Sequence, residues 1–72
     1  MLGTINSWWQ EIDDLYADCI SLSLMDIWSQ ANTDLYKLTR TYILLPADIE
    51  DAEDIIKDLK KEVVFARLKS NV

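Results

Sequence analysis

Apolar residues recur at alternating intervals of three and four positions from Ile5 to Leu45. At about 100° per residue, these positions stay within an arc of roughly 140° on one helical register. The pattern predicts a single long helix over about residues 7–45, which Ser7 and Gln10 would begin as a capping box. The members of this stripe are Ile5, Trp9, Ile12, Tyr16, Ile20, Leu24, Ile27, Ala31, Leu35, Leu38, Tyr42 and Leu45.

Pro46 ends the first stripe and predicts a turn. The residue before a proline is disfavoured in helical geometry, whereas proline itself is tolerated in the first turn of a helix. A second helix is therefore expected over about residues 47–69. Its charges support this reading, because residues 48–54 contain acids without bases and most bases follow from Lys57 onward, as the helix dipole favours.

A break in the first helix is the main alternative. Asp34 falls within the apolar arc, and residues 29–34 (SQANTD) are rich in residues that cap helices. A break near Asn32–Asp34 would give a small three-helix bundle in place of a helical hairpin. Both architectures are all-α, and we expect the hairpin to associate into an oligomer.

Charge placement favours the hairpin. If the second helix folds back at Pro46, Lys37 lies level with Asp54, so opposite charges face each other. A three-helix bundle makes the first and third helices parallel, which is expected to bring the acids of residues 11–18 beside those of residues 48–54. Like charges along whole segments oppose such packing.

The composition is that of one small domain over residues 1–72. The single glycine and single proline leave little material for hairpin turns, which argues against β structure. Cys19 is the only cysteine and histidine is absent, so we expect no internal disulfide, no Cys/His metal site and no cofactor. A core of this size is weak, and association is the remaining source of support.

The net charge of −6 is unevenly distributed, because residues 1–36 contain no base. Nucleic acids and anionic membranes attract proteins mainly through Lys and Arg, so direct binding to either is not expected. The sequence has no apolar run of the roughly 18 residues needed to cross a bilayer, and no signal-peptide pattern. We expect a soluble intracellular protein, located in the cytoplasm or in a virus particle.

The two predicted helices differ in length, about 60 Å against about 35 Å, so the second would cover the first only back to about residue 22. The uncovered part carries two apolar stripes, which predict a docking surface. Phe65 adds an apolar side chain on the far side of the second helix. The expected partner-binding residues are Trp8, Trp9, Ile12, Leu15, Tyr16, Cys19 and Phe65. In the three-helix alternative, the tryptophans would instead belong to the core.

Two functions follow as hypotheses. The first is a non-enzymatic protein–protein interaction or assembly subunit, either a homo-oligomer or part of a larger assembly. The second is an acidic inhibitor that mimics nucleic acid and blocks a nucleic-acid-binding protein, as small phage antagonists do. Its acidic surface would consist of Glu11, Asp13, Asp14 and Asp18. An enzyme is not expected, because histidine is absent and the chain is too small for a deep pocket.

Overall fold

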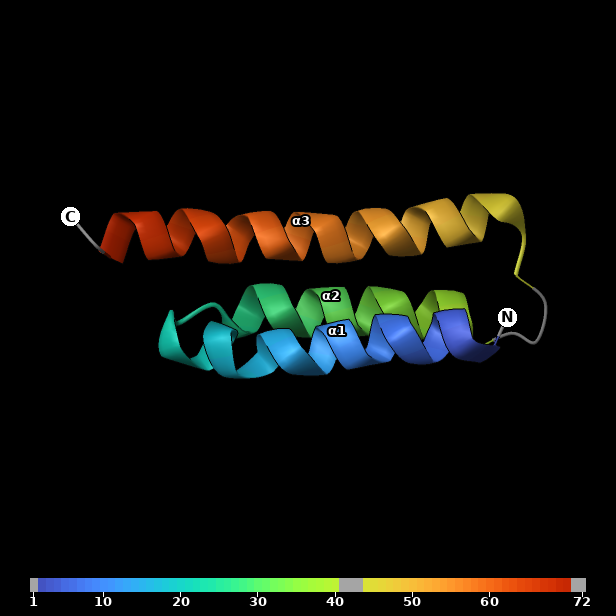
Figure 1. The fold of residues 1–72 in the computed structure, drawn as a ribbon, viewed down its shortest axis with the longest axis horizontal. Coiled ribbons are helices and arrows are strands. Elements are labelled where there is room, and N and C mark those ends of the chain that lie inside the picture. The colour runs from blue at the N-terminus through green and yellow to red at the C-terminus, as the bar shows by residue number, and fades with distance from the viewer. Residues whose placement is uncertain (1, 41–43, 71–72) are drawn as a thin grey trace.

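Three helices lie side by side in the computed structural model, which describes residues 2–40 and 44–70. They are α1 (Leu2–Ser21), α2 (Met25–Thr39) and α3 (Pro46–Ser70). Figure 1 shows that α2 runs antiparallel to both neighbours, whereas α1 and α3 run in the same direction. Every pair of helices is in contact, and the molecule measures 44 × 19 × 17 Å. The all-α expectation is confirmed for the described residues, and the arrangement fits the three-helix alternative.

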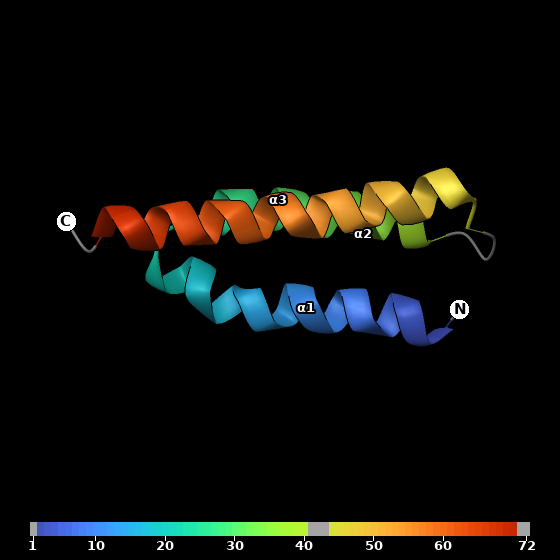
Figure 2. The same cartoon turned by 45° about the horizontal axis from the view of Figure 1, so that its top comes forward.

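The first helix is not continuous over residues 7–45, and this corrects the expected hairpin. It begins earlier, at Leu2, so Ser7 lies inside α1 and does not cap it. It also ends at Ser21, while the expected continuation through residues 41–43 lies outside the described residues. Figure 2 shows α1 as a separate rod along α3, joined to α2 by a tight connection.

The connection between α1 and α2 is a Schellman motif centred on Ser23. Ser23 has a φ of 60°, in the left-handed region that glycine usually occupies. The Leu24 N–H donates to the Cys19 carbonyl at 2.7 Å, and the Ser23 N–H donates to the Ile20 carbonyl at 3.3 Å. Leu24 then packs against the core, as the motif's apolar contact requires. The hydrogen bonds and this contact hold a serine where the sequence offers no glycine.

Replacing Ser23 with glycine should raise the free energy of unfolding by about 0.5–1 kcal/mol. Glycine relieves a left-handed conformation that costs other residues about 1–2 kcal/mol, although its freer unfolded chain offsets part of the gain. Chemical denaturation measures the change. Ser21→Gly, inside the end of α1, is the matched control and should destabilise by about 0.5–1 kcal/mol. A Ser23→Gly variant less stable than the natural protein would contradict the assigned turn.

The break expected near Asn32–Asp34 is also wrong, because these residues lie inside α2. The Gln30 side-chain amide donates to Asp34 Oδ1 at 2.9 Å, one helical turn away. Ala31 and Leu35 face the core from the same helix. Burial of this apolar stripe outweighs the weak helix propensity of the polar residues between them.

Helix α3 begins at Pro46, near the expected position. The Leu45 N–H donates to Asp48 Oδ2 at 3.1 Å, while the Leu45 carbonyl accepts from the Asp48 N–H at 2.9 Å. This reciprocal pair is the backward half of a capping box. It uses an acid at the positive end of the helix dipole.

The like-charge conflict expected for parallel first and third helices is confined to one hollow, which Glu11 lines with Glu53 and Asp54 and where Lys57 and Lys60 offset the acids. Lys60 Nζ lies 2.7 Å from Glu11 Oε1, and Arg67 Nη2 lies 2.7 Å from Asp18 Oδ1. Residues of α1 therefore meet residues 49 positions later in α3. In this register residues 48–54 lie beside the N-terminal end of α1, and most of its acidic residues 11–18 lie further along the helix. Side-by-side acids along the whole of both helices would require residues 11–18 to lie level with residues 48–54, and the offset of 49 residues prevents this.

The core consists of apolar side chains from all three helices. Trp8, Ile12 and Cys19 come from α1, Ala31 and Leu35 from α2, and Ala52, Ile56, Leu59 and Val63 from α3. A polar contact also links α1 to α2, because Trp28 Nε1 donates to the Ile12 carbonyl at 2.8 Å.

Candidate functional site

Three of the expected partner-binding residues are core residues of their own chain. Trp8 is 4% exposed, and Ile12 and Cys19 are fully buried. They were expected at a surface because a long first helix would have extended beyond the second. Instead α2 and α3 both pack along α1, so this apolar face is covered within the monomer.

The remaining expected residues do not form one surface with them. Trp9 and Leu15 are half-buried against the core. Tyr16 is exposed on one side and packs edge-on against Trp28, with ring centroids 4.8 Å apart. Phe65 is exposed on α3. The expected docking residues are therefore divided between the core, half-buried positions against it and exposed positions.

The expected acidic surface on α1 is partly neutralised. Glu11 and Asp18 form the two ion pairs with α3, whereas Asp13 and Asp14 are exposed. Cys19 is a core residue, and burial raises the pKa of its thiol, with a further contribution from the negative charge of Asp18. A protonated, buried thiol is a poor nucleophile, which is consistent with a packing role.

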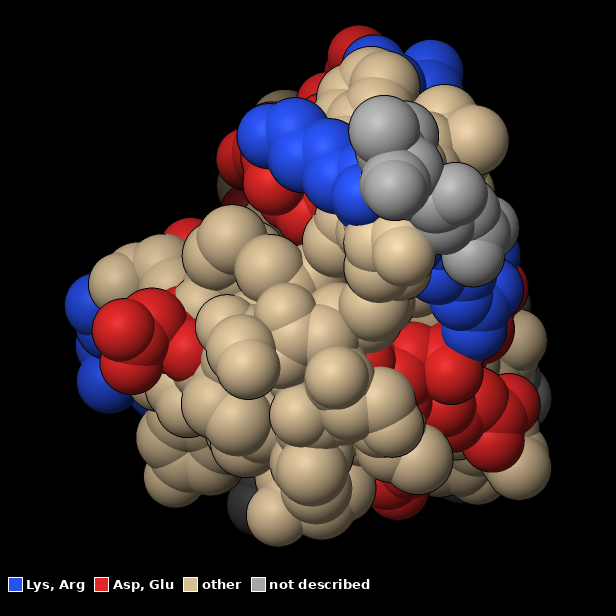
Figure 3. All heavy atoms as spheres, turned by 90° about the vertical axis from the view of Figure 1, so that its left-hand side faces the viewer, with Lys and Arg blue, Asp and Glu red and all other residues tan. Residues whose placement is uncertain are grey.

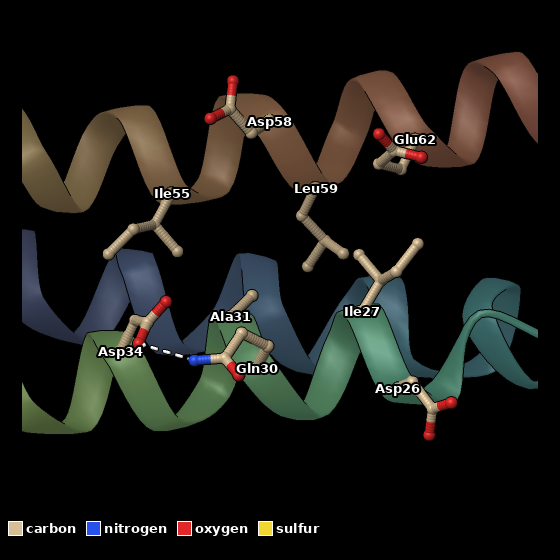
Figure 4. Close-up of a pocket in the computed structure, with 9 residues that line it drawn as sticks. All are labelled: Asp26, Ile27, Gln30, Ala31, Asp34, Ile55, Asp58, Leu59 and Glu62. Atoms are coloured by element: carbon tan, nitrogen blue, oxygen red, sulfur yellow. Dashed lines mark hydrogen bonds between the residues drawn. The ribbon is translucent and has the colours of Figure 1, made fainter.

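An unfilled groove lies between α2 and α3. Figure 4 shows the side chains of Ile27 and Ala31 from α2, and of Ile55 and Leu59 from α3, pointing into the space between the helices. Carboxylates and one amide stand along its edges: Asp26, Gln30, Asp34, Asp58 and Glu62. This part of the groove has a volume of ≈ 410 Å³.

The groove continues toward the other end of the two helices. A second hollow of ≈ 460 Å³ shares Asp34, Ile55 and Asp58 with the first. It adds four residues, namely Lys37, Leu38, Asp51 and Asp54. We call the two hollows together the α2–α3 groove. At 1.5 Å per residue it is about 17–18 Å long.

The rim of the α2–α3 groove is strongly acidic. Six carboxylates line it against a single base, Lys37; they are Asp26, Asp34, Asp51, Asp54, Asp58 and Glu62. Lys37 thus lies near Asp51 and Asp54, as the antiparallel alignment predicted. Among residues 2–40 and 44–70, however, none of the six carboxylates forms an ion pair. The groove therefore has a net negative charge, which Lys37 offsets only in part.

The seam between α1 and α3 provides a contrast within the same molecule. Its hollow, of ≈ 390 Å³, is lined by three acids together with Lys57 and Lys60. Two ion pairs bridge this seam. The two seams of α3 therefore differ in charge balance, because the seam toward α2 has one base for six acids and, among the described residues, no ion pair across it.

Sequence reasoning missed the groove, although two signals pointed to it. Asp34 was noticed as an acid within an apolar arc, where it suggested a break. Asp51, Asp58 and Glu62 recur near the spacing of helical turns beside Ile55 and Leu59. The charge order along the second helix includes Asp51 but does not account for Asp58 or Glu62. The spacing places acids beside the apolar stripe, but it does not identify which neighbouring helix they face.

The groove is suited to binding. No group of three or more Cys, Asp or Glu side chains in the described part of the chain is arranged to hold a metal ion. Among these same residues, no helix has both the length and the apolar character required to cross a membrane.

No protein-family model, curated protein or solved structure matches the chain. The groove's shape, apolar floor and charge are therefore the features of the molecule that bear on its function.

Proposed function

We propose that this protein is a non-enzymatic helical interaction subunit that binds a protein partner through the α2–α3 groove. The observation that carries the proposal is an apolar floor bordered by six carboxylates and one base. Ile27 remains 37% exposed on that floor, so a partner has apolar surface to bury. The groove takes the place of the docking surface expected on the first helix, because that face belongs to the core.

The partner's contacting segment should be a helix. Both walls of the groove are helices, whose backbone groups are already hydrogen-bonded within each helix, so they offer no edge to an extended peptide. A helix satisfies its own backbone and buries one apolar stripe between the two walls. Bases on both sides of that stripe would meet the acidic rims, as charges flanking a coiled-coil seam do.

The acidic rim also favours a second candidate function. Six carboxylates could occupy the basic surface of a nucleic-acid-binding protein and act as an antagonist. The two functions differ in the contribution of the apolar floor. A groove-bound helix should retain much of its affinity at high salt, whereas a charge-only mimic should lose it steeply.

A photo-crosslinking residue at Gln30 should capture the partner in native cells, because Gln30 lies on the groove rim. The same residue at Thr33 is the matched control, since Thr33 is exposed on α2 outside the groove. We expect a discrete protein adduct from position 30 that is absent from position 33. Equal labelling from both positions, or no discrete adduct from position 30, would contradict binding at the groove.

A salt series on the captured complex then separates the two candidates. Ile27→Ser should weaken the interaction of a groove-bound helix and leave a charge-only mimic largely unaffected. The reverse result, with steep salt dependence and no effect of Ile27→Ser, would favour the nucleic-acid mimic.

A further inference from the structure

We infer that the occupant of the α2–α3 groove is a second copy of this chain, which inserts the outer face of its own α3. The inference rests on the proposed function, because it names the partner of the same groove. The segment concerned is the basic end of α3, residues 57–69, which lies in the second half of that helix.

The basic end of α3 has exposed apolar side chains that pack against nothing in the monomer's core. Val64, Phe65 and Leu68 are 51%, 56% and 60% exposed. At about 100° per residue they lie on the side of α3 opposite the buried residues Ile56, Leu59 and Val63. Lys57 and Lys61 occupy the same outer side, and both are exposed. This outer face therefore combines apolar side chains with lysines, which would match the apolar floor and the acidic rim of the groove.

The charges of the two surfaces are complementary. The outer face carries two exposed bases, Lys57 and Lys61, in a chain whose total charge is −6. Two further bases of residues 57–69, Lys60 and Arg67, are already paired with acids of α1. The groove has six acids and one base, a net charge of −5. Figure 3 looks onto the end of the molecule where α3 terminates and shows basic side chains there, interspersed with acidic ones.

The two surfaces also agree in length. From Lys57 to Leu68 the outer face extends about 17 Å, which matches the groove's length of about 17–18 Å. The three apolar side chains would cover Ile27 and Ile55, while Lys57 and Lys61 reach the acidic rim. The groove and the outer face point in different directions from one α3, so a molecule cannot fill its own groove. The contact must join two copies through unlike surfaces.

Complementation between two defective variants tests this pairing. The groove variant carries Ile27→Ser and Asp34→Lys, and the outer-face variant carries Phe65→Ser and Leu68→Ser. The control is Tyr36→Ser, which removes an aromatic side chain that is 61% exposed and does not line the groove. Circular dichroism checks that each variant remains helical. If the groove variant loses helix, Gln30→Trp obstructs the groove from an exposed position instead.

Sedimentation velocity from about 1 µM to 1 mM should show that the natural protein associates, and 0.5 M salt should weaken the association. Each defective variant should associate about tenfold more weakly or worse, while Tyr36→Ser matches the natural protein. An equimolar mixture of the two defective variants should form 1:1 pairs, because it contains one intact groove and one intact outer face. If both copies instead used the same surface for the contact, mixing the two variants would not restore association.

Three results would overturn the inference: a natural protein that stays monomeric at about 1 mM, an outer-face variant that associates normally, or a mixture that shows no recovery. A monomeric protein whose Gln30 crosslink still captures a different protein would refute self-assembly and leave the proposed function intact. A crosslinked adduct of twice the chain's mass supports both the proposed function and self-assembly. The absence of any adduct, together with the absence of association, would refute both of them.

Discussion

Replacing Trp8 with alanine should lower the free energy of unfolding by about 3–5 kcal/mol. Trp8 is 4% exposed and belongs to the core formed by all three helices, so truncation loses its buried area and leaves a cavity. A domain of this size rarely has more than about 3–5 kcal/mol from its core. The variant should therefore be largely unfolded at 25 °C, which the helical circular dichroism signal and a urea titration would measure.

Phe65→Ala is the matched control for Trp8→Ala. It also removes an aromatic ring, but Phe65 is 56% exposed, so at protein concentrations too low for self-association stability should change by no more than about 0.5 kcal/mol. The comparison separates core from docking surface. A stable, helical Trp8→Ala protein would return Trp8 to the docking role expected from the sequence, and would contradict the observed packing of α1.

Replacing Leu35 with alanine should cost about 2–5 kcal/mol, the second large effect. Leu35 is fully buried, and α2 contacts both other helices, so the lost methyl groups leave a cavity at the junction of the three elements. The size of the loss depends on how far the neighbouring helices move to close the cavity. Thermal and urea denaturation of the purified variant would measure the loss.

Tyr36→Ala, at the next position of α2, is the control for Leu35→Ala. Tyr36 is 61% exposed, and its removal should change stability by no more than about 0.5 kcal/mol. If the two variants were destabilised equally, α2 would have to be rotated from the orientation described. Such a rotation would also remove Ile27 and Asp34 from the groove, so this pair of variants tests the fold on which the proposed function depends.

The two sides of α3 differ in how their charges are paired. Toward α1, Lys60 and Arg67 pair with Glu11 and Asp18 and complete the seam. Toward α2, the rim carboxylates have no paired cations among the described residues. Exposed ion pairs contribute only about 0–1 kcal/mol to stability, so the difference matters less for folding than for which protein surfaces each seam attracts.

Several features could be predicted from local sequence alone. The scarcity of glycine and proline and the apolar periodicity indicated helices, and the structure is all-helical in its described part. Pro46 was placed close to the start of the last helix because proline fits the first helical turn. The antiparallel alignment of α2 with α3 was also anticipated, since Lys37 was placed level with Asp54 before the structure placed both at one hollow.

The turn at Ser23 could not be predicted in the same way. Apolar periodicity continues through Ile20, Leu24 and Ile27, so the hydrophobic pattern has no interruption where the chain reverses. The usual sign of a helix C-terminus is glycine in the left-handed region, and here serine adopts that conformation. The capping residues at 29–34 offered a stronger local signal, but packing of Ala31 and Leu35 keeps that segment helical.

The sequence by itself determined that the chain is helical, where α3 begins and how charge is ordered along it, because these follow from interactions within a few residues. Only the tertiary structure decided which apolar faces are buried and which carboxylates find cations. A turn at residues 22–24 folds α2 back along α1, which turns the expected docking face around Trp8 into core. The 49-residue offset between α1 and α3 then pairs two acids of α1, Glu11 and Asp18, whereas the described carboxylates on the groove toward α2 form no ion pair. Register between distant helices depends on the packing of whole faces, which no local pattern specifies.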